Sequence, residues 1–350
     1  MKELKIADYS INKDSPVFII AELSANHNGS IETAIETVKA AKRAGADCIK
    51  LQTFTADTIT LNSKNEDFKI TQGTLWDGQY LHDLYKTTHL PWEWHRELMQ
   101  VAKDEGLICF SSPFDPTSVE FLETLGVPAY KIASFEITDI PLIELIASKG
   151  KPVIISTGIA EKEDIVLALD ACKRMGNEQI ALLKCTSSYP APIDEANMCM
   201  VKDLAERYKV ISGLSDHTMG NTVPVVATAM GAKIIEKHFI LDRSIGGADA
   251  SFSMTEVEFA NMVNAVREAE SAIGVVDYKL TEKQRKGRDF CRSLYVVEDI
   301  KVGELLTKAN VRSVRPGFGM HPKHFNKVLG KKAKTDLKKG EALKWEMIND

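Results

Sequence analysis

Two short apolar segments of the chain each carry a histidine at their polar end. Val210–Thr218 contains His217, and Lys233–Phe239 contains His238. Apolar, β-branched runs of this length are typical of strands, so the pattern predicts two neighbouring strands that deliver imidazoles to one place. The residue types suit a divalent cation, manganese first and otherwise magnesium or cobalt, that polarises a carbonyl oxygen as a Lewis acid. The alternative is that each is an ordinary core histidine.

The elements that would position these histidines recur along the first three quarters of the chain. Helix-like stretches, such as the one from the expected N-cap Ser30 to Ala44, separate the apolar runs. Eight such units within about 275 residues match a closed parallel (β/α)8 TIM barrel better than an open sheet. The eight runs are Val17–Ala21, Cys48–Gln52, Leu107–Ser111, Ala129–Ala133, Val153–Ser156, Ile180–Lys184, Val210–Gly213 and Lys233–Glu236.

In a parallel barrel all strands end at the same face, so their terminal polar residues are expected to meet there. Lys50, Lys131 and Lys184 stand at or near three of these ends, together with several hydroxyl groups. A single buried lysine would indicate a structural ion pair. Three lysines with hydroxyls favour a binding site for a small, multiply charged anion, such as one that carries phosphate and carboxylate.

Two further segments shape the expected domain organisation. The connection Thr53–Pro91 is long, and it predicts either a flap over the barrel or a surface excursion without a role. After Ile273 the pattern changes, which predicts a barrel domain at 1–274, a linker at 275–290 and a small β-rich domain at 291–350. Within that domain Asp299–Glu304 is echoed by Asp336–Glu341, so pseudo-symmetric turns are expected.

Composition excludes several functional classes. The 350 residues are 44% hydrophobic and 27% charged, with a net charge of −5, so no broad basic surface for nucleic acid is expected. No apolar run reaches the ~18 residues of a membrane span, and no signal peptide is evident, which predicts a cytoplasmic protein without a membrane partner. The six cysteines show no Cys-x-x-Cys spacing and are expected to be reduced.

Several motifs, taken together, resemble the sialic acid synthase family. The tail is similar to the antifreeze-like (SAF) domain of that family, through Arg292–Tyr295 and Val314–Gly319. The resemblance covers nearly the whole chain. The barrel motifs that carry it are Ala21–His27, Lys131–Ser134, Ser156–Gly158, Cys185–Pro190, Gly213–Thr218 and Glu236–Phe239.

The resemblance implies a TIM barrel followed by a SAF domain, and a metal-dependent condensation of phosphoenolpyruvate with an open-chain amino-sugar aldehyde that releases phosphate by C–O cleavage. Glu22–His27 and Arg292–Tyr295 are closest to the branch that converts 2,4-diacetamido-2,4,6-trideoxy-L-altrose to pseudaminate. The alternative branches make N-acetylneuraminate or legionaminate from a mannosamine-type sugar.

The resemblance also implies roles for particular residues. His217 and His238 bind the metal, and Glu22 is the base that activates water. A homodimer is implied, in which the SAF domain covers the barrel of the partner and Arg315 reaches the sugar; without the resemblance, Arg315 would be interpreted as a turn residue. The residues implied to bind phosphoenolpyruvate are Lys50, Ser111, Lys131, Ser134, Ser156, Ser187 and Ser215, and those on the sugar side are Gln52, Glu136, Tyr189, Asp249 and Arg315.

Two other functions compete with this hypothesis. A barrel aldolase would use Lys131 or Lys184 to form a Schiff base with a keto substrate. A non-catalytic sugar-binding protein could keep both domains, but it would have no need for the water-activating carboxylate of Glu22.

Overall fold

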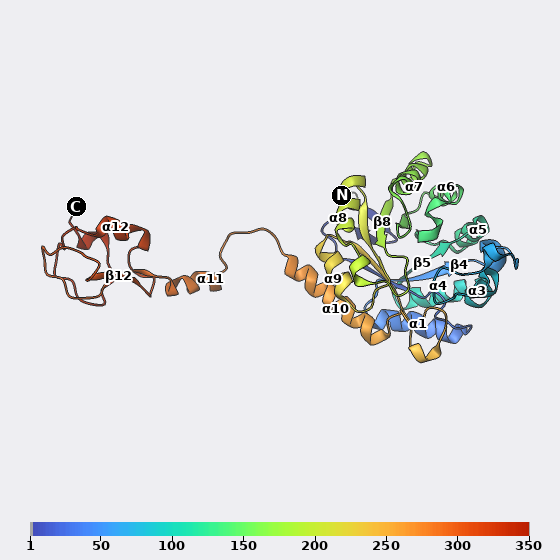
Figure 1. Ribbon diagram of the computed structural model, residues 1–350, viewed down its shortest axis with the longest axis horizontal. Coiled ribbons are helices and arrows are strands. Elements are labelled where there is room, and N and C mark those ends of the chain that lie inside the picture. Colours follow the sequence, from blue (N-terminus) through green and yellow to red (C-terminus); the bar gives the residue numbers. More distant parts are fainter. Residues whose placement is uncertain (1–2, 350) are drawn as a thin grey trace. The chain divides into compact units, whose positions relative to one another are not determined.

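The computed structural model describes residues 3–349. The chain forms two compact units, the first ending at Gly274 and the second beginning at Val275 (Figure 1). Within the described residues, no helix is long and apolar enough to span a bilayer.

The first unit is a closed barrel of eight parallel strands in the order β10-β3-β4-β5-β6-β7-β8-β9. This confirms the predicted TIM barrel. The strands are β3 (Phe18–Glu22), β4 (Cys48–Thr53), β5 (Ile108–Pro113), β6 (Tyr130–Ile132), β7 (Val153–Ser156), β8 (Ile180–Cys185), β9 (Ile211–Asp216) and β10 (Ile234–His238).

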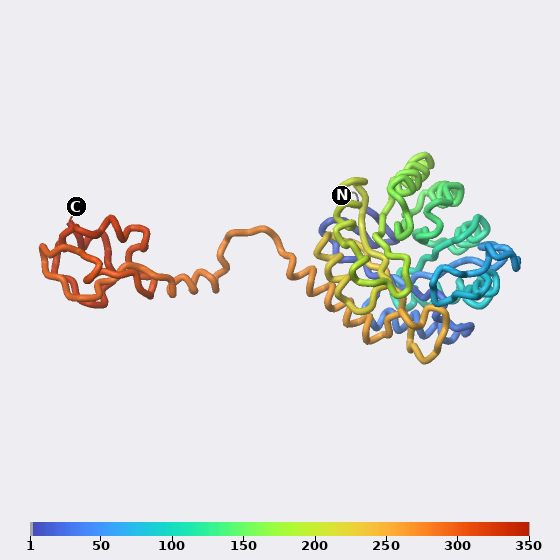
Figure 2. Tube along the Cα trace, in the orientation of Figure 1, coloured from blue at the N-terminus to red at the C-terminus, as the bar shows by residue number. Residues whose placement is uncertain are grey.

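Helices surround the barrel, as the alternation of runs predicts (Figures 1 and 2). The first begins as expected, because the Ser30 side chain accepts a hydrogen bond from Thr33 N. The last begins with a capping box between Thr255 and Glu258. The helices are α1 (Ile31–Arg43), α4 (His95–Asp104), α5 (Pro116–Leu125), α6 (Ile140–Ala147), α7 (Lys162–Arg174), α8 (Cys199–Tyr208), α9 (Thr222–Ala229) and α10 (Glu256–Ile273), with short 3-10 turns η3 (Ser134–Thr138), η4 (Ile193–Glu195) and η5 (Arg243–Ile245) in the loops.

Side chains alternate between two apolar layers along each strand. On β3, Ile19 packs outward with helix residues, whereas Phe18 and Ile20 belong to the core inside the barrel. An N-terminal hairpin of β1 (Leu4–Ile6) and β2 (Tyr9–Ile11) adds apolar side chains to this inner core. The sequence pattern does not predict the hairpin, because its strands have only three residues each.

The long connection after β4 is partly helical. It contains α2 (Ala56–Ile59), the 3-10 turn η1 (Glu66–Phe68), α3 (Leu81–Thr88) and, next to α4, the 3-10 turn η2 (Trp92–Trp94). Residues 54–91 are called the flap below. It is neither a bare loop nor an isolated excursion, since Phe54 packs on Tyr85 within the flap and on Phe114 after β5.

The second unit contains α11 (Glu282–Gly287), the 3-10 turn η6 (Arg288–Phe290), the antiparallel pair β11 (Ser293–Val296) and β12 (Val311–Val314), η7 (Pro322–His324), α12 (Phe325–Val328) and η8 (Trp345–Met347). The segment expected as a linker therefore includes a short helix.

The echoed turns of this unit make reciprocal contacts. Asp299 accepts from Lys339 N and pairs with Lys338, each at 2.9 Å. Asp336 accepts from Val302 N at 2.9 Å and pairs with Lys301 at 3.0 Å. The repeated sequence thus folds into two turns that brace each other in the same way.

Candidate active site

The inward positions at the ends of the strands carry the charged residues. In the parallel register, Glu22 lies beside His238 on one side and beside Lys50 on the other. Glu236, two residues before His238, lies beside Ser215 of β9. Since residues that are aligned in neighbouring strands share a face, these side chains point to the same end of the barrel interior.

Two lysines and two carboxylates form a buried network at this end. Lys50 Nζ contacts Glu22 Oε2 and lies 3.1 Å from Glu236 Oε1. Lys131 Nζ lies 3.8 Å from the same Glu236 oxygen and donates to Ser156 Oγ at 2.6 Å. None of the four charged side chains is more than 6% exposed. Buried charges at this density require mutual pairing, which the network supplies.

The network shifts the pKa values of Lys50 and Glu236. Burial, together with the neighbouring Lys131 charge, lowers the pKa of Lys50 to about 8, although Glu236 acts in the opposite direction. Burial alone would raise the pKa of Glu236, but Lys131 and Lys50 hold it below its usual range. At neutral pH Glu236 is therefore a carboxylate, held in place by the two lysines.

Hydroxyl groups border these lysines. Ser215 Oγ donates to Glu236 Oε1 at 2.9 Å. Ser187 Oγ donates to Ser134 Oγ at 3.0 Å, and a Cβ on Gly158 would collide with both of these serine oxygens. Glycine at 158 is therefore what lets the two hydroxyls meet. The fold thus gathers the predicted phosphoenolpyruvate residues Lys50, Lys131, Ser134, Ser156, Ser187 and Ser215 around one end of the barrel.

Two predicted residues lie on the wrong face. Ser111 of β5 occupies an outward position and bonds Thr53 Oγ1 at 2.6 Å, so it does not join the lysines, whereas its neighbour Ser112 takes the inward position beside Gln52. Lys184 of β8 is also outward and donates to the Cys185 carbonyl at 2.7 Å. The expectation of three converging lysines is wrong, because consecutive residues of a strand point to opposite faces.

The two histidines lie close together, as predicted. Their ring centroids are 5.3 Å apart. Four residues before each histidine, Gly213 permits the close approach of β9 to β10, since a Cβ there would collide with the Ile234 carbonyl.

The surroundings of each histidine leave one nitrogen available to a cation. His217 Nδ1 lies 3.0 Å from the Thr186 carbonyl, which can only accept, so Nδ1 carries a proton and Nε2 is the available atom. His238 Nδ1 is buried without a hydrogen-bond partner and lies 3.7 Å from Asp249 Oδ2. Burial holds the pKa of His238 well below its usual value, so its imidazole is neutral. Two imidazoles so arranged fit a metal ion.

Residues assigned to the sugar side lie next to the histidines or near the lysines. The Tyr189 ring packs 4.4 Å from His217 and 5.1 Å from Phe252. Asp249 accepts hydrogen bonds from Ser24 Oγ and Ala25 N.

Glu136 is the other carboxylate of the sugar side. Its Oε2 is buried without a hydrogen-bond partner. Burial raises the pKa of Glu136 to about 7, against the lowering effect of Lys131. Gln52 is at an inward position of β4. Arg315 follows β12 in the second unit, and its predicted role in the site of a partner stays a prediction.

A second buried ion pair supports the histidine strands from outside. Asp216 stands next to His217 in the sequence, but it pairs with Lys237 and accepts from Thr218 N at 2.9 Å. Both charged residues alternate with the inward histidines. Lys237 is not among the predicted residues, although its place next to the inward His238 assigns it to the outer face.

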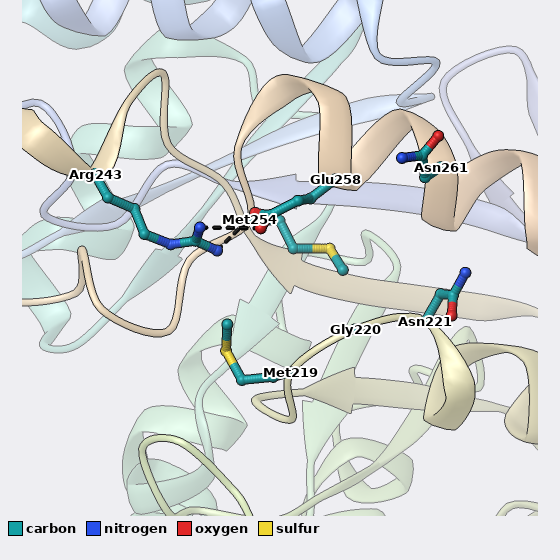
Figure 3. Close-up of a pocket in the computed structure, with 7 residues that line it drawn as sticks. All are labelled: Met219, Gly220, Asn221, Arg243, Met254, Glu258 and Asn261. Carbon is teal, nitrogen blue, oxygen red and sulfur yellow. Dashed lines mark hydrogen bonds and ion pairs between the residues drawn. The ribbon is translucent and has the colours of Figure 1, made fainter.

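A separate pocket of about 210 Å³ lies between the loops that follow β9 and β10 (Figure 3). Arg243 and Glu258 in its wall satisfy each other through two hydrogen bonds of 3.0 and 2.6 Å. The pocket therefore presents no free charge. Its lining residues are Met219, Gly220, Asn221, Arg243, Met254, Glu258 and Asn261, and none of them was predicted to bind a substrate.

Comparison with known proteins gives the family of the chain. The sequence model of the NeuB family matches residues 37–278, and that of the SAF domain matches residues 292–349. The pseudaminic acid synthase of Campylobacter jejuni is 51% identical over 335 residues, which cover 96% of this chain and 97% of that protein. The pseudaminic acid synthase of Helicobacter pylori is 47% identical over 324 residues, covering 92% and 95%.

A solved structure agrees with this result. The N-acetylneuraminic acid synthetase of Leptospira borgpetersenii, in complex with citrate, superimposes with a TM-score of 0.73 at 29% identity, covering 82% of this chain and 95% of that one. From the family match over most of the barrel and the identity to full-length relatives, we conclude that the chain belongs to the NeuB family and ends in a SAF domain.

Proposed function

We propose that this chain is a pseudaminic acid synthase. It condenses phosphoenolpyruvate with the open-chain aldehyde of 2,4-diacetamido-2,4,6-trideoxy-L-altrose and forms pseudaminate and phosphate with C–O bond cleavage. Its 47–51% identity to synthases of that name supports the choice of sugar. The observation that carries the chemistry is the buried network of Lys50, Lys131 and Glu22 beside the histidine pair.

The lysines and serines suit phosphoenolpyruvate. Its phosphate and carboxylate carry several negative charges, and Lys50 and Lys131 supply two ammonium groups in a water-poor site. Hydroxyls from Ser134, Ser187 and Ser215 offer donors around them. Binding of the anion would draw Lys50 away from the two carboxylates that now neutralise it.

His217 and His238 suit a divalent cation, for which manganese is our first choice. Among residues 3–349 no group of three or more histidine, cysteine or acidic side chains is arranged for a metal, so water and substrate oxygens would complete its ligands. A cation held by these two imidazoles would polarise the aldehyde oxygen.

In the remaining steps of the reaction, a side chain of this protein moves a proton. C3 of phosphoenolpyruvate attacks the aldehyde carbon, and the aldehyde oxygen takes a proton from water. Water adds at C2, and Glu22, whose Oε1 is buried without a hydrogen-bond partner, takes a proton from it. Cleavage of the C2–O bond then releases phosphate, the C2 hydroxyl gives up its proton to the departing phosphate, and the 2-keto acid remains. Arg315 from a partner subunit in a homodimer, and a cytoplasmic location, remain predictions of the family resemblance.

An assay of phosphate release tests the proposal. Phosphoenolpyruvate is supplied with the altrose, with N-acetylmannosamine or with 2,4-diacetamido-mannose, before and after treatment with chelator. We expect release that requires both substrates, is fastest with the altrose and stops when metal is removed. Preference for a mannose-type sugar would indicate a neuraminate or legionaminate synthase, and turnover without metal would refute the role of the histidines.

Two further measurements, borohydride trapping and sugar binding, separate the competing classes. An adduct trapped by borohydride would indicate a Schiff-base aldolase acting through Lys131, because Lys184 lies on the outward face. Tight sugar binding without phosphate release at any metal concentration would indicate a sugar-binding protein.

A further inference from the structure

The flap carries a tryptophan to the edge of the site. The ring centroid of Trp76 lies 5.8 Å from that of Tyr189, and Tyr189 packs on His217 at 4.4 Å and faces His238 at 6.5 Å. A single aromatic side chain therefore separates the indole from the histidine pair.

Backbone hydrogen bonds hold the tip of the flap in one conformation. Ile70 N donates to the Gln79 carbonyl at 2.9 Å, and Gly78 N donates to the Ile70 carbonyl at 2.8 Å. These bonds close residues 70–79 into a loop with a paired base. Trp76 is thus presented by a structured loop and not by a free chain segment.

A carboxylate inside the loop fixes the residues next to the tryptophan. Asp77 accepts from Gly73 N at 2.9 Å and from Thr74 N at 2.8 Å, and Thr74 Oγ1 in turn accepts from Trp76 N at 3.3 Å. The backbone of Trp76 is therefore anchored within its own loop, independently of the contact that its ring makes with Tyr189.

The two large apolar residues of the tip differ in their surroundings. Leu75 is 54% exposed. Trp76 is partly buried, and its Nε1 is shielded from solvent with no hydrogen-bond partner among the described residues. A buried N–H without an acceptor is unfavourable, because it loses its hydrogen bond to water and gains none in return. An acceptor that entered between the flap and Tyr189 would remove this cost.

A second part of the flap borders the same side of the site. Burial, and then the Glu136 charge, raise the pKa of Tyr85 on α3, which indicates that this phenol lies near that carboxylate. Glu136 and Tyr189 are both assigned to the sugar side. The flap therefore borders residues that are assigned to the sugar side, through the packing of Trp76 on Tyr189.

We propose that Trp76 determines sugar specificity by binding, with Tyr189, an acetamido group of the substrate. The indole N–H donates to the carbonyl oxygen of the acetamido group, and the two rings cover its methyl group. The proposal rests on the proposed function. The group bound is the one at C4, so the contact selects 2,4-diacetamido sugars as a class, because N-acetylmannosamine carries its single acetamido group at C2.

Three variants separate the contributions of donor, ring and loop. Trp76→Phe keeps an aromatic ring and loses the donor, Trp76→Ala loses both, and Leu75→Ala changes the exposed neighbour as the matched control. For each variant, kcat and the Michaelis constants for both substrates are measured with the altrose and with the diacetamido-mannose sugar. N-acetylmannosamine is measured as a substrate or as a competitive inhibitor, and thermal unfolding shows that the variants are folded.

We expect Trp76→Ala to raise the Michaelis constants for the diacetamido sugars by about tenfold or more, with Trp76→Phe in between. In the Trp76 variants, the Michaelis constant for phosphoenolpyruvate and the constant for N-acetylmannosamine should stay within about twofold of the wild type. In Leu75→Ala, all constants should stay within that range. The role of Trp76 would be overturned if the constants for all three sugars rose equally or if the Michaelis constant for phosphoenolpyruvate rose by a comparable factor. It would also be overturned if no constant changed.

The outcome is distinguishable from failure of the proposed function. If the wild type uses a sugar other than the altrose, the proposed substrate is wrong. The effect of the Trp76 variants is then measured with the sugar that the enzyme uses. A rise in the Michaelis constant that is selective for the diacetamido-mannose sugar would then still support the acetamido contact. A wild type that acts only on N-acetylmannosamine would refute both.

Discussion

Lys237 and Asp216 form an ion pair on the outer face of β9 and β10, and each side chain is only 1% exposed. Lys237 also donates to the Thr218 carbonyl at 2.5 Å. The pair therefore joins the two strand ends immediately beside His217 and His238. Stability and the geometry of the histidines both depend on it.

Replacing Lys237 with Met should lower the free energy of unfolding by about 3–5 kcal/mol, because it leaves Asp216 charged and buried without its partner. Denaturant unfolding measures the change. Lys151→Met is the control, since Lys151 and Glu123 form an ion pair whose side chains are 26% and 33% exposed, and it should cost about 1 kcal/mol or less. An equal loss of unfolding free energy in the two variants would contradict the idea that burial sets the contribution of an ion pair to stability.

Glu22→Gln should reduce kcat by about 100-fold or more with little effect on either Michaelis constant, because the amide keeps the shape of the side chain but cannot take a proton from water. Steady-state phosphate release gives these constants. Glu36→Gln on the exposed face of α1 serves as the control and should behave like the wild type. A large rise in a Michaelis constant at unchanged kcat would assign Glu22 to binding.

Ser112→Ala and Ser111→Ala should differ although the two residues are adjacent. Ser112 points inward and its Oγ is buried without a partner, so its loss should raise the Michaelis constant for phosphoenolpyruvate by about tenfold. Ser111 bonds Thr53, which bonds His95 Nε2 at 2.8 Å, so its loss should lower the melting temperature and leave that constant unchanged. The reverse pattern would show that the strand register is misassigned.

Glu136 should make stability fall with rising pH. Its pKa is raised mainly by burial, from 4.5 to about 7, so the folded state binds the proton more tightly than the unfolded state does. The stabilisation is complete below about pH 4.5 and is lost as the pH rises to about 7, by up to about 3 kcal/mol. Unfolding at about pH 5 and about pH 8 measures the difference, which Glu136→Gln should reduce by that amount. An unchanged difference in the variant would mean that Glu136 titrates normally.

The sequence by itself determined the barrel, the histidine pair and the lysine-rich face. The eight apolar runs have a length and spacing that few folds other than a closed parallel barrel accommodate, and strand ends in such a barrel converge by necessity. The echoed turns of the second unit were likewise visible, because identical residue types at identical spacing make the same contacts.

Only the tertiary structure decided whether each strand-end side chain points into or out of the barrel. It also decided which residues from distant parts of the chain contact that side chain. A strand end located to within one residue leaves the face undetermined, which is why the sequence pattern places Ser111 and Lys184 inward. The contact of Trp76 with Tyr189 joins residues 113 positions apart (189 − 76) through the fold of a flap. No local periodicity encodes such a contact, because it depends on loop hydrogen bonds and on packing between distant segments.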